Sequence, residues 1–420
     1  MRGDYQQLVD EISAALGAPA TLEDRDFGLI AFGAHESEDD EVMDPVRTRS
    51  ILQRRSSAAV RAWFEAFGIA RARTPLRIPP DPAAGVFKGR ICLPVRHRGI
   101  VHGYVWLLDD GHLTDLALGG HGTPPDPRIA QAMETAARIG ALLADEARAG
   151  SELGDLLREL LLAPADGRPA AAAALGEALR DTLRFTPGAP LTLIAVAPWD
   201  PTDTGAAPLP GLPGLLAACP LRATAGHRSA TPLPTLAALV RLRSPGALTP
   251  AHTVAEQLLR SPRAGAAAAA DRRGTKRAAP PPSRLPGTAG IGLGTQELTE
   301  LPVTWREALD AARAARAEPR LGPITQWDAI GSYRMLTALP VTEPDPAIGP
   351  LLTPAHAELA RTAEVFLDCA GQAGRAAQAL GIHRQTLYYR LGRVEKLTGL
   401  DLADGEHRLL LHMALKAARL

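Results

Sequence analysis

This chain of 420 residues has three cysteines, few aromatic residues and no net charge, and each of these features limits the kinds of site or core that it can form. The three cysteines, Cys92, Cys219 and Cys369, stand far apart, so no pair is spaced for a zinc site or a redox-active dithiol. Isolated thiols of this kind are typical of a reducing cytosol. Aromatic residues make up only 4% of the chain, so its cores must consist mainly of leucine, alanine, valine and isoleucine.

The charge balance excludes two further classes of protein. The 46 basic and 46 acidic residues cancel, which rules out a uniformly basic nucleic-acid coat and an acidic disordered chain, but leaves room for a local basic patch. No apolar run reaches 18 residues and none stands at the amino terminus, so we expect neither a membrane span nor a signal peptide. The sequence therefore predicts a cytoplasmic protein, and its length predicts two to four domains.

The first 125 residues have the pattern of a small α+β domain. Amphipathic helices alternate with short strands and are followed by a hairpin whose turn covers residues 96–99. The order of these elements is typical of a sensory domain with an antiparallel sheet. We expect a helix over 5–16, strands over 21–24 and 27–32, a helix over 48–67, and hairpin strands over 89–95 and 101–108.

Residues 126–163 are predicted to be helical. We expect the helix to begin at Pro127 and to end near Leu162, with a break or kink at residues 150–151. A long helix that leaves a small domain is typical of a dimer seam, but two ordinary helices that pack on their own domains fit the pattern equally well. Both interpretations stay open at the level of sequence.

Residues 164–338 predict a second, α/β domain that a low-complexity segment interrupts. The segment from about 261 to 290 is rich in alanine, proline and glycine, so we expect a mobile insert. Residues 339–350 are rich in proline and predict a linker. The expected strands cover 191–196, 236–242, 289–294 and 323–325, and the expected helix covers 303–317.

The last segment, residues 351–420, has the clearest pattern and is expected to be entirely helical. Its second and third helices have the features of a helix-turn-helix, because the small Ala377 allows close approach and Gly381 relieves a tight turn. Asp404 is placed to cap the last helix. The predicted helices cover 353–370, 374–380, 384–397 and 404–418.

The two faces of the third of these helices differ in chemistry. Leu387, Leu391 and Val394 recur at helical spacing and are expected to hold the helix against the second one. The opposite face carries glutamine, tyrosine, arginine and lysine. Residues 372–398 contain five basic residues and one acidic residue, a local charge of +4 in a chain that is neutral overall.

A basic, aromatic face of this kind favours DNA binding over a helical hairpin with a solvated charged surface. Arginine and lysine would contact phosphates, and Thr386 and Tyr388 would donate further hydrogen bonds to them. Gln385 is the candidate for a base-edge contact, because glutamine pairs with adenine. The residues predicted to contact DNA are Arg375, His383, Arg384, Gln385, Thr386, Tyr388, Tyr389, Arg390, Arg393 and Lys396.

The run from Ala377 to Leu391, its continuation over 393–402 and the residues 408–411 resemble the C-terminal DNA-binding domain of PucR/CdaR-type transcription regulators. The resemblance covers about 60 residues. It implies a Fis-like helix-turn-helix that binds double-stranded DNA as a homodimer.

A weaker resemblance extends upstream. Residues 290–292, 305–313 and 327–336 are similar to the GGDEF-like central domain of that family, and residues 93–96 and 103–108 to a GAF-like domain that some members carry. The resemblance implies a multidomain α+β protein. Its parts would be a GAF-like α+β sensor over 1–125, a degenerate GGDEF-like α/β domain over 164–338 and an all-α helix-turn-helix domain over 351–420.

Signals of catalysis and metal binding are weak. Gly290, Gly292 and Gly294 lack the acidic partner and the strand-glycine-helix context of a nucleotide loop, and are interpreted as the edge of a strand. No Gly-Gly-Asp/Glu-Glu-Phe run occurs, so the middle domain is expected to lack cyclase activity. We therefore predict no catalytic residue, no cofactor and no metal.

Two side-chain groups in the first domain leave alternatives open. The histidines near Cys92 match no standard metal spacing and are expected to be solvated. An aromatic group is expected to form core, with a ligand pocket as the alternative. The histidines are His97, His102, His112 and His121, and the aromatic residues are Trp63, Phe64, Phe67, Tyr104 and Trp106.

These patterns together predict a dimeric, effector-responsive transcription regulator that is not an enzyme and contacts no membrane. A small-molecule effector would bind the first domain, and the last domain would bind DNA at two half-sites about 34 Å apart or a multiple of that spacing. One alternative is a signalling protein whose middle domain binds a nucleotide without cyclase activity. Another is a scaffold that uses its helices for protein contacts.

Overall fold

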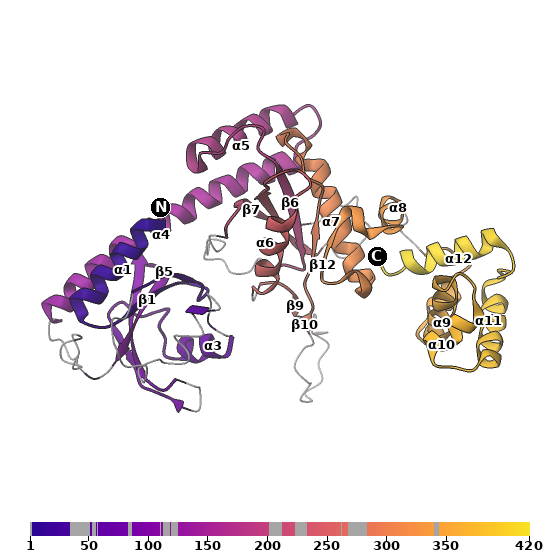
Figure 1. Cartoon of the computed structure of the whole chain (residues 1–420), viewed down its shortest axis with the longest axis horizontal. Helices are drawn as coiled ribbons and strands as arrows, with labels where there is room; N and C mark the ends of the chain where they lie inside the picture. Colours follow the sequence, from indigo (N-terminus) through magenta and orange to yellow (C-terminus); the bar gives the residue numbers. More distant parts are fainter. Residues whose placement is uncertain are drawn as a thin grey trace. The chain divides into compact units, whose positions relative to one another are not determined.

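The chain, drawn in Figure 1, forms two compact units in the computed structural model. Each unit has its own hydrophobic cores. Met1–Glu152 is the body of unit 1, and Leu153–Thr202 with Pro213–Leu420 forms unit 2. Most of the stretch predicted as the middle domain, and all of the last, therefore lie in unit 2. The structure describes residues 2–33, 51–52, 56, 58–82, 86–109, 111, 118, 125–200, 212–222, 233–261, 263–267, 284–339 and 344–420.

Unit 1 is built on a five-stranded antiparallel sheet in the order β2-β1-β5-β4-β3. Helices α1 and α4 cover one face, and α3 covers the other. The strands are β1 (Ala20–Asp24), β2 (Leu29–Phe32), β3 (Leu76–Ile78), β4 (Gly89–His97) and β5 (Ile100–Asp109). The helices are α1 (Arg2–Leu16), α3 (Ala58–Ala66) and the first part of α4 (Pro127–Leu162).

The hairpin of unit 1 follows the prediction, whereas the helix before it is shorter. β4 and β5 include both expected strands, and Gly99 in the turn has a φ of 83°. Alternate residues along these strands face opposite helices, which is why both strands are almost wholly buried. The helix expected over 48–67 is observed at residues 51–52 and in α3, among the residues that the structure describes there.

The aromatic group of unit 1 is a core, as favoured from sequence. Phe64, Tyr104 and Trp106 are at most 5% exposed, and their rings pack around Phe27 at centroid distances of 5.6–6.3 Å. Phe67 lies at the rim. The sheet face under α3 is therefore filled by aromatic side chains.

The histidine group does not assemble into a metal site in the described part of the chain. His97 and His102 lie on β4 and β5, whereas His112 and His121 fall outside the described residues. Burial, His97 and Arg25 lower the pKa of His102. Burial raises the pKa of the Cys92 thiol far above its usual range. No group of three or more His, Cys, Asp or Glu side chains among the described residues is arranged to hold a metal ion.

Helix α4 is continuous, so of the break or kink predicted at residues 150–151 the break is wrong. A single glycine inside a helix costs only about 1 kcal/mol relative to alanine. Beyond Gly150, Leu153, Leu157 and Leu160 are buried against the sheet of unit 2, and this packing outweighs that cost.

Unit 2 contains a five-stranded mixed sheet in the order β12-β11-β6-β8-β7. β11 and β12 are parallel, and the other neighbours are antiparallel. The strands are β6 (Leu191–Ala197), β7 (Leu215–Arg222), β8 (Pro234–Arg241), β11 (Thr288–Ile291) and β12 (Ile324–Gln326). One face of the sheet forms a hydrophobic core with α4, α5 (Arg168–Leu183) and α7 (Leu301–Ala317). Helix α6 (Thr249–Leu259) also packs on the sheet, but its residues are not part of that core.

The glycine run of unit 2 lies under a helix and is not a strand edge. β11 pairs on one side with β12 and on the other with β6, so it is an inner strand. A Cβ at Gly290 would collide with the Ala308 carbonyl of α7, and one at Gly292 with the Thr304 carbonyl. The glycines let α7 lie directly on the strand, which leaves their surface no room for a phosphate. A short ribbon of β9 (Ala266–Ala267) and β10 (Arg284–Leu285) flanks residues outside the described set.

The carboxyl-terminal part of unit 2 is helical, as predicted. Its core is formed by leucine, alanine, valine and isoleucine with Phe366. The start expected at Thr353 is a 3-10 turn, and the regular helix begins at Ala357. The helices are α8 (Tyr333–Ala338), α9 (Ala357–Asp368), α10 (Ala373–Leu380), α11 (Arg384–Thr398) and α12 (Gly405–Ala417). None of the described helices is long and apolar enough to cross a membrane.

Candidate nucleic-acid interface

A tight turn joins α10 to α11 and sets the angle between them. Gly381 ends α10 with a φ of 66°, a conformation that glycine adopts without strain. The amide of Gly381 donates to the carbonyl of Gln378 at 3.1 Å, and the amide of Ile382 donates to that of Ala377 at 3.0 Å. These two bonds form a Schellman motif, which satisfies the last carbonyls of α10. The turn predicted at residues 381–383 is confirmed.

The first residue after this turn caps α11. His383 has extended backbone, and its Nδ1 accepts a hydrogen bond from the amide of Gln385 at 3.3 Å. On the inner face of α11, Leu387, Leu391 and Val394 are at most 6% exposed and pack in the core with α9 and α10. The predicted packing face is confirmed, and it directs the opposite face outward.

The outward face gathers most of the residues predicted to contact DNA. Tyr388 is 60% and Tyr389 68% exposed, although both rings are large and apolar. Surface area of this kind is common at binding sites. Arg384 lies across the start of α10, since a Cβ at Gly374 would meet its Nη2 at 2.5 Å. The exposed members of the predicted set are Arg375, His383, Arg384, Gln385, Thr386, Tyr388, Tyr389, Arg393 and Lys396.

Arg390 is the exception in that set. Its Nη2 lies 2.6 Å from Oε1 of Glu358 on α9, and its side chain is only 19% exposed. Arg390 therefore ties α11 to the helix behind it. The single acidic residue of this stretch, Glu395, is likewise engaged, because its Oε1 accepts from the amide of Leu402 at 2.9 Å.

The start of α12 follows the predicted cap. Oδ1 of Asp404 accepts from the amide of Glu406 at 2.8 Å and from that of His407 at 3.0 Å. Such a cap satisfies amides that have no partner within the helix. It fixes where the last helix begins and hence where its later residues lie.

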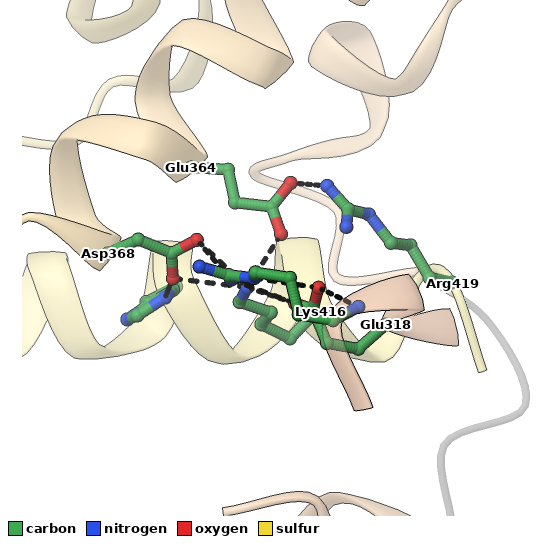
Figure 2. Close-up of polar contacts among 7 residues, drawn as sticks. Glu318, Glu364, Asp368, Lys416 and Arg419 are labelled. Atoms are coloured by element: carbon green, nitrogen blue, oxygen red, sulfur yellow. Dashed lines mark hydrogen bonds and ion pairs between the residues drawn. The ribbon is translucent and has the colours of Figure 1, made fainter. Parts of the chain in front are cut away.

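A second polar cluster, centred on Lys416 of α12, was not anticipated from the sequence. Lys416 is only 7% exposed, and it lies close to Glu318, Glu364 and Asp368 (Figure 2). A lysine between Leu415 and two alanines is the one local signal, because that stretch of the helix is otherwise apolar. Its partners lie up to 98 residues away, so no spacing pattern reveals them.

A family model and two curated relatives match parts of this chain. The family model of the PucR C-terminal helix-turn-helix domain matches residues 359–417. The Carbohydrate diacid regulator of Escherichia coli is 58% identical over 40 residues, 10% of either chain. The Purine catabolism regulatory protein of Bacillus subtilis is 29% identical over 137 residues, 31% of this chain and 26% of that protein. The matched stretches thus span well under two thirds of either relative.

A solved structure, that of the Regulator of Polyketide Synthase Expression from Bifidobacterium adolescentis, aligns with 63% of this chain and 91% of its own. The identity is 18% and the TM-score 0.26, values too low to establish a shared fold. The family match and the two curated relatives agree with the geometry of α10 and α11. Residues 359–417 thus match the helix-turn-helix domain of PucR-type regulators, and parts of the chain are similar to two transcriptional regulators of this type.

Proposed function

We propose that the protein is a sequence-specific, DNA-binding transcriptional regulator. The observation that carries the proposal is the outward face of α11, where Gln385, Tyr389 and Arg393 are exposed opposite a buried apolar face. In a helix-turn-helix, such a face enters the major groove and the neighbouring helix crosses the backbone. Arginine and lysine would then bind phosphates, and Gln385 would contact a base edge.

The geometry refines the set of proposed DNA contacts. Nine of the ten predicted residues are exposed, whereas Arg390 is held by Glu358. We propose that Arg390 holds α11 against α9 through its ion pair with Glu358. Arg393, three residues further along α11, would contact phosphate. The exposed N-terminus of α11, where the amide of Thr386 lies beside the Gln385 amide that His383 caps, offers a further site for a phosphate.

The proposal includes a homodimer and a small-molecule effector. A single helix-turn-helix makes few base contacts, so tight specific binding requires two half-sites and two copies of the chain. Unit 1, proposed as the GAF-like sensor, would bind the effector, and the sheet of unit 2, proposed as a degenerate GGDEF-like domain, would transmit its presence. The protein would act in the cytoplasm without catalysing a reaction.

Selection from random-sequence DNA tests this function. Full-length protein would be used to select duplexes, and fluorescence polarisation at two salt concentrations would compare selected with random DNA. We expect preference for the selected duplex by a factor of about 10³ or more. We also expect Gln385→Ala to lose about 1–3 kcal/mol of discrimination at one base pair. Equal affinity of the wild type for selected and random duplexes would refute the proposal.

A further inference from the structure

The Lys416 cluster joins the helix-turn-helix region to the sheet region of unit 2. Nζ of Lys416 lies 3.2 Å from Oε2 of Glu318, 2.9 Å from Oε1 of Glu364 and 3.1 Å from Asp368. Glu364 and Asp368 belong to α9, but Glu318 follows α7 of the sheet region. Figure 2 shows the three carboxylates converging on the one ammonium group. One buried cation therefore binds both regions.

A second bridge runs in parallel with the first. Arg320, in the 3-10 turn η5 (Pro319–Leu321) that follows α7, donates through Nε to Oε1 of Glu318 at 2.9 Å. Its Nη2 donates to Oδ2 of Asp368 at 3.0 Å. Arg320 thus crosses from the sheet region to α9 on the more exposed side of the cluster.

The charges of the cluster balance. Three cations, Lys416, Arg320 and Arg419, face the three carboxylates, and Arg419 contacts Glu364. Nε2 of His412 also lies 3.0 Å from Oδ1 of Asp368. Buried charges are costly unless they are paired in this way, so the contact is held only while both regions contribute their groups.

An apolar contact continues the junction beyond the charges. Met413, Ala417 and Leu420, spaced along one side of α12 and the residues after it, pack with Tyr333 and Leu336 of α8 and with alanines of α7. Leu411 and Leu415, on another side of α12, lie in the helix-turn-helix core. Helix α12 therefore contributes to both cores.

This junction leaves the proposed DNA-binding face open. The junction uses α9 and α12, whereas Gln385, Tyr389 and Arg393 of α11 remain exposed while it is formed. A contact that blocks DNA by covering α11 is thereby excluded. What the junction fixes is where α11 is held relative to the sheet of unit 2.

We propose that the Lys416 cluster is a latch that positions the DNA-binding helix for simultaneous contact with two half-sites. The inference rests on the proposed function, because it assigns a regulation to that DNA-binding site. In the proposed homodimer, one copy of α11 binds the first half-site. If the other copy is held at a fixed place, it then meets the second half-site at a high effective concentration. Opening the latch frees the helix-turn-helix region and loses this advantage, but leaves the contacts to each half-site intact.

The sheet side of the latch offers the cleanest variant. Glu318→Gln with Arg320→Gln removes both bridges but keeps every residue of α9 to α12, so the helix-turn-helix core is unchanged. The matched control is Glu256→Gln with Arg260→Gln, which removes an exposed ion pair of 3.4 Å on α6 in the same unit. Both variants would be made in the full-length chain.

Two measurements decide the proposal. Hydrogen exchange should rise in α8 and at the end of α12 in the latch variant, stay unchanged in α10 and α11, and stay unchanged throughout in the control. On a duplex selected by the wild type, the latch variant should bind about tenfold more weakly, whereas on one half of that duplex its affinity should stay within about twofold.

The outcomes separate the latch from the proposed function. Unchanged exchange in α8 and α12, equal weakening on both duplexes, or tighter binding to the full duplex would each overturn the latch. If the wild type selects no duplex at all, the proposed function fails and the positioning role fails with it. The exchange data would then still show whether the cluster joins the two regions.

Discussion

The two units bury charged side chains in opposite ways. In unit 1, Glu23 of β1 is 4% exposed and is held mainly by neutral donors, with Nε1 of Trp106 at 2.9 Å and Oγ of Ser56 at 3.2 Å. Burial raises its pKa to about 8, although these hydrogen bonds oppose the shift. In unit 2, hydrogen bonds from Arg320 and then Lys416 lower the pKa of Glu318 to about 2.

The difference shows that the depth of burial and the charge of the partner together decide the protonation state. Burial alone disfavours a carboxylate, and neutral donors only partly offset that effect. Charged donors reverse it, as Arg320 first and then Lys416 do for Glu318. Asp368 follows the same rule. Burial raises its pKa, but the hydrogen bonds from Lys416 and His412 lower it, and the net pKa lies below the ordinary value. Unit 1 is thus expected to prefer a protonated acid and unit 2 an ionised one.

Removing the central cation is expected to have the largest effect. Lys416→Met removes the cation that Glu318, Glu364 and Asp368 share, while Arg320 and Arg419 stay beside Glu318 and Glu364. Breaking a buried ion pair typically costs about 3–5 kcal/mol. The free energy of unfolding of the full chain, measured by urea denaturation, would show the loss. Lys396→Met, at an exposed lysine of α11, should change it by at most about 0.5 kcal/mol. Equal effects of the two substitutions would refute the assignment of Lys416 as a structural cation.

The second test concerns the acid of unit 1. Between pH 4.5, the ordinary pKa, and about 8, the folded chain keeps a proton on Glu23 that the unfolded chain has released. Its contribution to stability therefore falls as the pH rises through this range, by up to about 1.4 kcal/mol per pH unit. Glu23→Gln should remove that slope from the unfolding of unit 1. The control Glu11→Gln, at an exposed partner of Arg138, should keep it.

The acid of unit 2 should give a slope of the opposite sign. The unfolded chain binds a proton on Glu318 near pH 4.5, but the folded chain does so only near pH 2. Its stabilising contribution is complete above pH 4.5 and is lost as the pH falls toward 2. The difference in unfolding free energy between the wild type and Glu318→Gln should therefore shrink from pH 6 to pH 3. A constant difference would mean that Arg320 and Lys416 do not lower the pKa of Glu318.

Two arginines of α11 also differ in their partners, with a smaller expected effect. Arg390 pairs with Glu358, whereas Arg393 is exposed. Arg390→Gln breaks the ion pair with Glu358 and should cost about 1 kcal/mol of stability or less, with the salt dependence of DNA binding unchanged. Arg393→Gln should leave stability unchanged and reduce the salt slope by about 1. Polarisation titrations at several salt concentrations, beside thermal unfolding, distinguish the two. A reduced slope for Arg390→Gln would place that side chain on the DNA.

Local signals explain why the helix-turn-helix could be predicted. Gly381, the leucines of α11 and the cap at Asp404 act within a few residues of one another, and the structure confirms all three. Their spacing alone also divided the exposed from the buried face of α11. The sequence could not show that Arg390 is held by Glu358, because the ion pair depends on how α9 packs behind α11.

The sheet of unit 2 was predicted only in part. β6 and β8 are apolar runs and were expected, whereas β7, α5 and α6 were missed. α5 consists largely of alanine and has no marked apolar stripe, and β7 contains Pro220 and follows a segment rich in proline and glycine. Tertiary packing against the rest of the sheet determines these elements more than their local sequence does.

Long-range polar contacts escaped prediction altogether. Glu23 meets Trp106 across 83 residues, and Lys416 meets Glu318 across 98. In both cases the partners come together only when distant elements pack side by side. The motif-based hypothesis therefore predicted the helix-turn-helix and its exposed face, but neither the buried acid of unit 1 nor the Lys416 cluster of unit 2.

The sharing of α12 between two cores has a consequence for how unit 2 melts. Fraying of its last turns would open the apolar contact with α8 and expose the carboxylates of α9 at the same time. Elements joined in this way unfold as one cooperative unit. We expect α8 and the end of α12 to open together, before the sheet and the helix-turn-helix unfold. A fragment that ends before α9 would lack the contacts of this junction. Its residues should therefore melt at a lower temperature than they do within the full chain.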